Sequence, residues 1–394
     1  MNLNQRWRAL WAAENDEIPE AVWWLGGLLL ALLLRFSLWN FENYDTRDFL
    51  VPWYNAIVNN GRWRSFGLGF SNYTPPYLYL LTLVSYLPFS PLHAVKFVSF
   101  LFDFPLAYYV MRLVGLRQEN RTARLAAFML TLFAPTVFCN SALWGQCDAM
   151  YTTFLLGALY YLFRQNTLWA LLFFALALAF KLQAIFLLPL FGIYYLRGKF
   201  PVHYWLTIPG VYLAAILPAW LLGRPLRELL TIYVGQTKTY PALTQSAANF
   251  YQWIPQNIVT AWNRSGVLFT GGLLFLLAFL VVRSRALLTN ELLLKLALCV
   301  LLLVPFTLPH MHERYFFAAD IVALVYAFYF PRYYYLAILV GGSSLLSYTP
   351  FLYGKPAFDL AYVALAMLAA LIIVTADLLR DLYPRTADTG EMSS

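Results

Sequence analysis

Long apolar runs separated by short polar turns dominate this 394-residue chain. A helix needs about 20 apolar residues to cross the hydrocarbon core of a bilayer. The apolar runs predict twelve membrane-spanning helices, at residues 21–39, 92–114, 123–141, 148–164, 167–181, 184–197, 203–222, 265–283, 289–308, 315–331, 333–350 and 357–380. An even number places both termini on one side of the membrane. That parity depends on counting the short neighbours 167–181 and 184–197 as two spans.

The composition predicts an all-α, polytopic membrane fold with additional loop and interfacial helices outside the cytoplasm. Hydrophobic residues make up 61% of the chain and charged residues 12%, whereas soluble domains carry about 25% charged residues. An ordinary soluble fold is therefore excluded. The net charge of +8 is spread between the apolar runs instead of forming one basic stripe, so we expect no nucleic-acid partner.

Basic residues mark the turns on one side of the predicted bundle. They are Arg112, Arg117, Arg121, Arg124, Arg164, Arg197, Lys199, Arg283, Arg285, Arg332, Arg380 and Arg385, and they share a side with Arg6 and Arg8. The positive-inside rule makes that side cytoplasmic. A span at 75–88 would invert this pattern, but prolines bracket that run at about 14 residues, which is short for a crossing. We therefore expect 75–90 to lie on the outer surface.

The predicted topology divides the chain into five parts. These are a cytoplasmic tail (1–20), a transmembrane module (21–222) that includes a first outer loop (40–91), a second outer loop (223–264), C-terminal helices (265–380) and a cytoplasmic tail (381–394). Most of the polar motifs fall in the outer segments, so function is expected there.

Two carboxylates follow the first predicted span. Asp45 and Asp48 are three residues apart, which places them on one face if the stretch is helical. A pair of this kind can act as a general base and its partner. The alternative is a solvated acidic loop in which these residues pair with Arg47.

The sequence WGQCD lies where one predicted span ends outside and the next begins. It supplies Trp144, Gln146 and Asp148 as candidate binding or supporting residues. Asp148 can orient another side chain or bind a sugar hydroxyl group. The alternative is that it caps the helix that begins at Ala149.

Several polar residues lie within or between the apolar runs. Lys181 and Gln183 separate two short half-spans, and a lysine there must snorkel, pair with an acid or meet an anion in an aqueous cavity. Asp103 lies near the middle of the span 92–114, seven residues after Lys96 and on the same face. An intramembrane carboxylate indicates either function or helix packing.

The turn HMHERY combines two imidazoles, a carboxylate and a guanidinium group in His310, His312, Glu313 and Arg314. Guanidinium groups match phosphate oxygens and histidine donates hydrogen bonds, so this turn is a candidate phosphate site. A zinc site and a structural hydrogen-bonded cluster are the alternatives, although H-x-H alone lacks a third ligand.

The loop 223–264 is rich in aromatic and amide side chains. Both sugar sites and interfacial aromatic belts have this composition. The three cysteines show no zinc spacing and predict no disulfide framework.

The order of these motifs resembles the GT-C superfamily of membrane glycosyltransferases, particularly bacterial relatives of GPI-anchor mannosyltransferases and the dolichyl-phosphate-glucose glucosyltransferases. The matching stretches are YDTRDFLVPWYNAI, FSNYTPPYLYLL, the helix from Lys96 to Asp103, LWGQCDAMY, FKLQAIFLLP, NFYQWIP and LPHMHERYFF. Together they extend from about residue 41 to residue 320.

The resemblance implies an inverting hexosyl transfer from a polyprenyl- or dolichyl-phosphate sugar, with mannose favoured and glucose next. Asp45 matches the catalytic position and Asp48 is the second candidate, while Lys181 and the His310, His312 and Arg314 turn match positions near the donor phosphate. A lipid-linked glycan, a lipid or a protein is expected as acceptor, and no metal cofactor is expected.

This resemblance also favours a bacterial plasma-membrane protein whose site faces away from the cytoplasm. A transporter or flippase of lipid-linked saccharides is the alternative function, and a noncatalytic scaffold is a third. Transporters often contain inverted repeats. The sequence shows no convincing repeat, which favours the enzyme.

Overall fold

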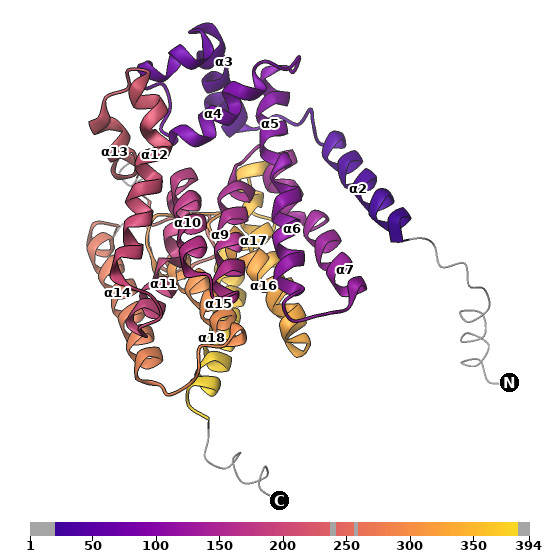
Figure 1. Cartoon of the computed structure of the whole chain (residues 1–394). Helices are drawn as coiled ribbons and strands as arrows, with labels where there is room; N and C mark the ends of the chain where they lie inside the picture. The colour runs from indigo at the N-terminus through magenta and orange to yellow at the C-terminus, as the bar shows by residue number, and fades with distance from the viewer. Residues whose placement is uncertain (1–19, 237–241, 256–258, 385–394) are drawn as a thin grey trace, which may run out of the picture.

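The computed structural model describes residues 20–236, 242–255 and 259–384, and its regular structure is almost entirely helical (Figure 1). The N-terminal half contains α2 (Glu20–Ser37), a π-helical turn (Thr46–Leu50), α3 (Val51–Asn59), a 3₁₀ segment (Arg62–Leu68), α4 (Pro75–Val84), α5 (Pro91–Leu101), α6 (Asp103–Val114), α7 (Arg121–Leu132), α8 (Pro135–Phe138), a second π-helical turn (Cys139–Leu143), α9 (Asp148–Phe163) and α10 (Thr167–Phe180).

The C-terminal half begins with a 3₁₀ segment (Leu182–Leu187) that leads into α11 (Leu188–Leu196). It continues with a 3₁₀ turn (Val202–Leu206), α12 (Thr207–Leu221), α13 (Leu226–Gln236), β1 (Thr244–Gln245), a 3₁₀ turn (Phe250–Trp253), α14 (Val259–Arg283), α15 (Asn290–Thr307), β2 (Met311–His312), α16 (Phe317–Tyr329), a 3₁₀ turn (Pro331–Tyr333), α17 (Tyr334–Tyr353) and α18 (Leu360–Leu382).

Seven helical segments in the described part of the chain are long and apolar enough to cross a membrane. They are Pro91–Val114, Arg121–Leu143, Val202–Leu221, Trp262–Arg283, Asn290–Thr307, Pro331–Tyr353 and Leu360–Leu382. The predicted count of twelve crossings is not confirmed, because the other predicted spans are shorter helices. At 1.5 Å per residue, the 16 residues of α9 extend about 24 Å, short of the roughly 30 Å hydrocarbon core.

Two predicted spans contain breaks that the hydrophobic pattern did not reveal. The span 92–114 is interrupted at Phe102, where α5 ends and α6 begins. The span 123–141 breaks at Ala134, whose backbone is extended because it precedes Pro135. The run 75–88 does form a short helix, α4, with proline in its first turn, as expected of a segment too short to cross.

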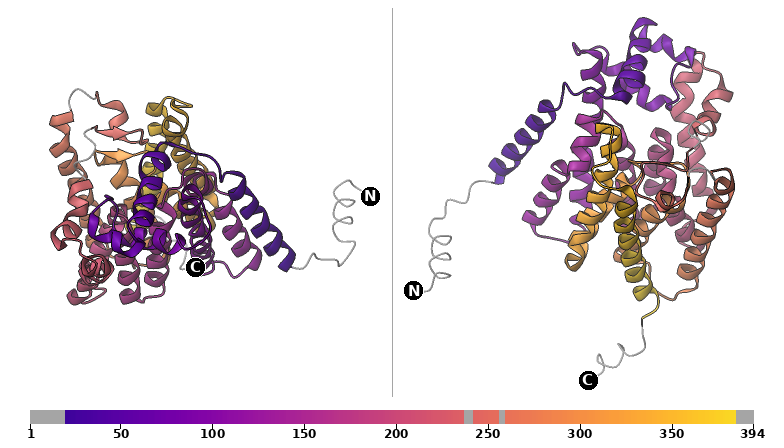
Figure 2. Two further views of the ribbon diagram at one scale, coloured as in Figure 1. Left: turned by 90° about the horizontal axis from the view of Figure 1, so that it is seen from above. Right: turned by 180° about the vertical axis from the view of Figure 1, so that it is seen from behind.

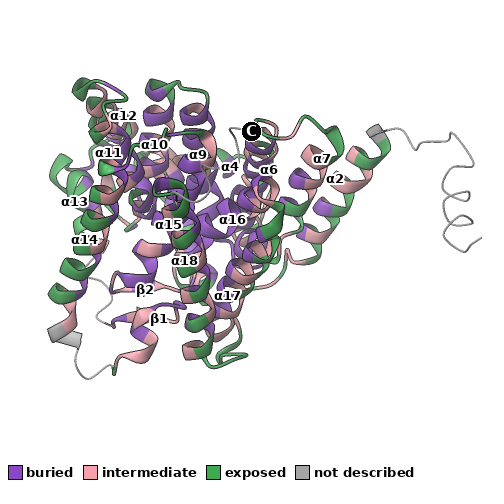
Figure 3. Ribbon diagram, turned by 90° about the horizontal axis from the view of Figure 1, so that it is seen from below, coloured by how far each residue is buried: buried purple, intermediate pink, exposed green. Residues whose placement is uncertain are grey.

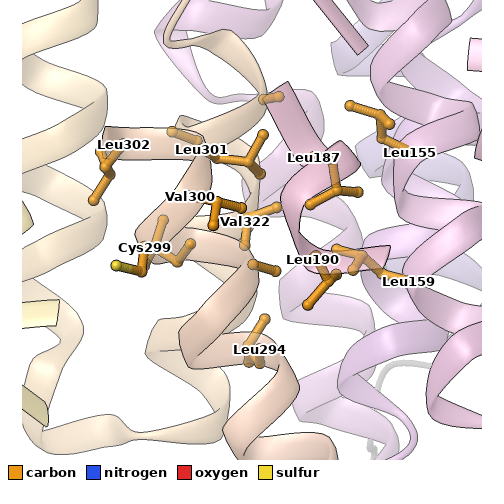
Figure 4. Close-up of a cluster of buried hydrophobic side chains, with 14 of the residues drawn as sticks. Leu155, Leu159, Leu187, Leu190, Leu294, Cys299, Val300, Leu301, Leu302 and Val322 are labelled. Atoms are coloured by element: carbon orange, nitrogen blue, oxygen red, sulfur yellow. The ribbon is translucent and has the colours of Figure 1, made fainter. Parts of the chain in front are cut away.

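Helix α15 forms the centre of the bundle. Nearly all of its residues from Leu292 to Thr307 are buried, which is typical of a helix surrounded by other helices. Figure 4 shows side chains of α15 near Val322 of α16 and near Leu187 and Leu190, which lie between α15 and Leu155 and Leu159 of α9. This apolar core fixes the helices whose ends carry the polar motifs.

Helices α12 and α14 lie at the periphery and expose apolar side chains. Leu221 is 73% exposed, and Leu268 and Phe275 are 76% and 75% exposed. Figure 3 shows the exposed surface of α13 and α14 beside the buried interior of the bundle. Large apolar side chains facing outward are expected of helices in contact with lipid.

The first predicted outer loop and the arginine-bearing turns lie at opposite ends of the molecule. Helix α4 and the 3₁₀ segment Arg62–Leu68 pack against α12, and α3 packs against α4 at the same end, far from the α6–α7 turn in both side views (Figures 1 and 2). At the other end, Arg117 pairs with Glu291 at 3.6 Å, and Arg197 donates to the carbonyl oxygen of Ala286 at 2.8 Å. The turns at Arg117 and Arg197 therefore share one end, as the charge pattern predicts, while Arg6, Arg8 and Arg385 lie outside the described residues.

Candidate functional site

Three helix ends meet beside the first-loop segment. Helix α9 begins at Asp148, α10 ends one residue before Lys181, and α16 begins shortly after Arg314. Lys181 itself is extended, with φ −154° and ψ 137°, and this turns the chain sharply between α10 and the following 3₁₀ segment. Residues far apart in the sequence are thereby brought within ion-pair distance.

Asp148 is the buried anion of this cluster. Its Oδ1 lies 2.5 Å from Lys181 Nζ, and its Oδ2 accepts a hydrogen bond from Asn140 Nδ2 at 2.8 Å. Arg314 Nε lies 3.4 Å from the same Oδ2. The carboxylate therefore does not cap α9, whose N-cap residue is Cys147 with no side-chain cap bond, and the capping alternative is wrong. Lys181 pairs with an acid and does not snorkel.

Asp45 stands on the other side of Arg314. Its Oδ2 accepts hydrogen bonds from Trp144 Nε1 at 2.9 Å and Gln146 Nε2 at 2.5 Å, and it lies 3.9 Å from Arg314 Nη1. Oδ2 accepts both of these hydrogen bonds, and Oδ1 takes part in neither. Burial raises the pKa of Asp45 above its ordinary value, although the Arg314 charge and the Trp144 hydrogen bond oppose the rise.

The side chain of Asp48 pairs with Arg47 and not with Arg314. Both of its oxygens accept hydrogen bonds from Arg47 at 3.1 Å, and its side chain is 36% exposed. The turn Thr46–Leu50 is π-helical, so a spacing of three residues does not place Asp48 on the face that carries Asp45. The structure therefore brings Asp45 into the cluster and leaves Asp48 in the predicted alternative pairing with Arg47.

Arg314 is the cation that joins the carboxylates. Its Nη1 donates to Glu313 Oε1 at 2.6 Å, and its guanidinium carbon lies 5.4 Å from the centre of the Trp144 ring. Burial alone would lower the pKa of Arg314, but Glu313, Asp45 and Asp148 raise it well above its ordinary value. Burial likewise opposes ionisation of Glu313, yet contacts with His312 and Arg314 lower its pKa. Arg314 and Glu313 are therefore charged.

A cavity of about 450 Å³ adjoins the cluster on its cationic side. Its basic lining residues are Lys181, His310, His312 and Arg314, and no aspartate or glutamate lines it among the described residues. Neutral polar side chains complete the wall, namely Asn72, Tyr73, Gln183 and Gln236. The apolar lining includes Ile185 and Val267, which are 39% and 53% exposed. The cavity therefore combines cations, amide groups and an apolar margin.

The two histidines are fixed by a short parallel pairing of β2 with β1, in which His312 is opposite Gln245. His310 Nδ1 lies 2.8 Å from the carbonyl oxygen of Ala242, and His310 has a φ of +64°, a strained value for a residue with a side chain. His312 Nδ1 lies 3.7 Å from Glu313. No group of three potential metal ligands occurs among the described residues, so the zinc alternative gains no third ligand.

Asp103 and Lys96 share a face as predicted, but that face is directed at the end of the first helix. Asp103 accepts hydrogen bonds from Arg35 at 2.9 Å and Ser141 at 2.6 Å, and Lys96 donates to the carbonyl oxygen of Leu38 at 2.8 Å. Arg35 and Asp103 are fully buried. Asp103 therefore acts in helix packing, outside the cluster around Arg314.

The aromatic part of the second outer loop packs against the helices instead of lining the cavity. Tyr251 donates to the carbonyl oxygen of Thr307 at 2.8 Å, and Trp253 donates to that of Ala361 at 3.1 Å. Gln236, at the end of α13, does line the cavity. Residues 237–241 and 256–258 of this predicted sugar-binding loop lie outside the described residues.

The sequence did not single out Tyr73 or Asn140. Tyr73 lines the cavity with its ring centre 6.0 Å from Lys181 Nζ, and its hydroxyl group lies 3.4 Å from Gln146 Oε1. It thereby contacts both the cavity and the Asp45 cluster. Asn140 could have been recognised from the sequence, because it carries an amide group within a predicted apolar span.

A search against models of known protein families found no match, and a search of curated proteins found no similar sequence.

Proposed function

We propose that this chain is a multi-pass membrane glycosyltransferase that moves a hexose from a lipid-phosphate sugar to an acceptor outside the cytoplasm. The observation that carries the proposal is the cavity, which is lined by Lys181, His310, His312 and Arg314 and by no described acid. Such a wall suits a phosphate, since cations and imidazoles donate charged hydrogen bonds to its oxygens.

The position of the carboxylates supports separate places for proton transfer and for phosphate binding, one on each side of Arg314. Asp45, Asp148 and Glu313 hold the two cations from behind, while the cations also face the cavity. The exposed apolar margin at Ile185 and Val267 offers a path for a lipid tail from the bilayer. The donor phosphate and the candidate base then lie on opposite sides of one guanidinium group.

The proposed step is a single inverting displacement. An acceptor hydroxyl oxygen attacks the anomeric carbon from the face opposite the leaving group, and the bond from that carbon to the lipid-phosphate oxygen breaks. Asp45 takes the hydroxyl proton, and the departing lipid phosphate keeps the electron pair. Lys181 and Arg314 stabilise the charge on the leaving phosphate, which needs cations more than an acid.

Reconstitution into liposomes with radiolabelled polyprenyl-phosphate mannose or glucose tests this function. The enzyme transfers the label covalently to an acceptor from a membrane extract. Transbilayer movement of intact donor without a covalent product would instead establish the flippase alternative. Failure of both donors to bind would overturn the assignment of the cavity.

A further inference from the structure

A second group of buried polar side chains lies behind the candidate site, between α9, α16 and α17. Asp320 is 5% exposed, and Ser344 and Tyr348 are fully buried. Within the part of the chain that the structure describes, no hydrogen bond of good length and angle reaches either oxygen of Asp320 or the hydroxyl groups of Ser344 and Tyr348. Polar groups buried in this way are normally satisfied by protein or by internal water.

These side chains face one another. Ser344 is close enough to both Asp320 and Tyr348 to act as a hydrogen-bonding neighbour of each, and Asp320 also interacts electrostatically with Tyr348. On the α9 side, Tyr151 and Thr152 are fully buried, their hydroxyl groups have no hydrogen-bond partner, and Tyr151 interacts with Tyr348. One carboxyl group and several hydroxyl groups therefore share a buried region with few well-formed hydrogen bonds among the described residues.

The charge state of Asp320 follows from its surroundings. No lysine, arginine or histidine in the described part of the chain forms an ion pair with it, whereas the equally buried Asp377 contacts Lys295 at 2.8 Å and Arg332 at 3.0 Å. Asp320 lies in the first turn of α16, where the helix dipole favours an anion. That effect is smaller than the cost of burying an unpaired carboxylate.

We propose that Asp320, Ser344 and Tyr348 form a proton-holding site in which Asp320 is a neutral carboxylic acid that is hydrogen-bonded to the two hydroxyl groups directly or through internal water. A neutral acid supplies one donor and keeps acceptor capacity, so it matches hydroxyl groups and water without an adjacent cation. A bound monovalent cation is the other possible occupant, and the response to sodium in the test below distinguishes the two.

The site also has a location that bears on the candidate centre. The Tyr348 ring packs edge-on against Trp144 at 5.4 Å, and Trp144 donates to Asp45. The candidate centre already holds three carboxylates around two cations. Because Asp320 is uncharged in this proposal, it adds no further negative charge next to Tyr348, the residue that packs against Trp144.

Infrared difference spectroscopy of the reconstituted full chain tests this site directly. Wild-type protein minus Asp320→Asn should show the carbonyl band of a protonated carboxylic acid, and the band should shift in deuterated water. The matched control is Asp377→Asn, whose difference spectrum should show only an ionised carboxylate. Absence of the protonated band for Asp320 overturns the proposal. Loss of the band on addition of sodium at constant pH also overturns it, because a cation would then occupy the site.

Thermal unfolding of the same variants gives an independent result. Asparagine replaces a neutral acid with similar shape, so Asp320→Asn should unfold at the wild-type temperature. Asp377→Asn, which removes a charge from an ion-paired network, should unfold at a lower temperature. Failure of Asp320→Asn to fold, while Asp320→Glu folds, would show that Asp320 needs its charge and would overturn the proposal.

Discussion

Arg314 Nη1 lies 3.9 Å from Asp45 Oδ2, on the far side of the cavity wall that the same guanidinium group helps to form. One residue therefore links the candidate base to the candidate phosphate pocket. The charge of Arg314 is permanent because three carboxylates raise its pKa. The variants below are chosen to test the candidate base and the candidate phosphate pocket separately.

The sharpest prediction concerns Asp45. Asp45→Asn keeps the shape of the side chain but cannot accept the proton of the acceptor, and loss of a general base typically costs about 10² to 10⁴ in rate. Donor binding should survive, because the carboxylate does not line the cavity. Turnover and donor binding in liposomes measure the two effects separately.

Asp48→Asn is the matched control for Asp45→Asn. Its carboxylate bonds only to the exposed Arg47 among the contacts described above, so turnover should stay within a few-fold of the wild type. Full activity in Asp45→Asn together with loss in Asp48→Asn would transfer the role to Asp48. Full activity in both would end the first-loop carboxylate mechanism.

Removal of Lys181 should weaken donor use. A charged hydrogen bond is worth roughly 1.5 to 3 kcal/mol, which corresponds to about ten- to 100-fold in donor KM. Lys181→Met alone removes the nearer of the two cations that contact the buried Asp148, so Lys181→Met/Asp148→Asn is the informative variant. We expect the double variant to regain thermal stability relative to Lys181→Met while its donor KM stays high. Wild-type donor KM in the folded double variant would contradict the phosphate assignment.

The pH dependence of turnover should reveal the raised pKa of Asp45. The base works in its ionised form, so kcat/KM should fall as pH drops through a pKa above the ordinary 3.8. Trp144→Phe removes a hydrogen bond that lowers this pKa, so the acid limb should move to higher pH. Trp253→Phe, which loses only a bond to the Ala361 carbonyl, is the control. An acid limb that stays in place in Trp144→Phe would argue against Asp45 as the titrating group.

Asp103 should affect stability and not the chemical step. Asp103→Leu leaves Arg35 buried without its partner, and breaking a buried ion pair costs about 3 to 5 kcal/mol. Arg35→Met/Asp103→Leu removes both charges and should recover most of that loss. Thermal unfolding measures the effect, and donor KM should be unchanged in the double variant. A double variant that is stable but inactive would return Asp103 to the list of catalytic candidates.

The predicted orientation can be tested with single cysteines. Asn59 in α3 and Arg283 at the end of α14 are both exposed and lie in segments predicted on opposite sides of the membrane. An impermeant thiol reagent added outside cells should label Asn59→Cys and leave Arg283→Cys unlabelled until the membrane is permeabilised. The wild-type chain with its three native cysteines gives the background. The opposite pattern would place the candidate site in the cytoplasm.

Hydrophobic runs and charge were sufficient to predict the all-α fold and the sharing of one end by the basic turns. They did not predict the break at Phe102 or the π-helical turn after Asp45, because both depend on packing and not on composition. Lys181, Asp148 and Arg314 were recognisable as polar residues in apolar surroundings. Their mutual contacts were not, since residues 33 and 133 positions apart along the chain meet only when three helix ends converge. The same limit applies to Tyr73, which has no local signal apart from its place before two prolines.

Helix α10, which ends at the candidate centre, is shorter than α14 at the periphery. At 1.5 Å per residue, α10 with its 14 residues extends about 21 Å, and α14 with its 25 residues extends about 38 Å. In the proposed orientation, the ion-pair cluster at the end of α10 then lies deeper in the membrane than the outer end of α14. A donor headgroup has to reach that depth while its tail stays in the bilayer. The distance that the headgroup moves therefore changes with bilayer thickness. The acyl-chain length of the surrounding lipid then becomes a determinant of donor affinity, independent of any residue in the protein.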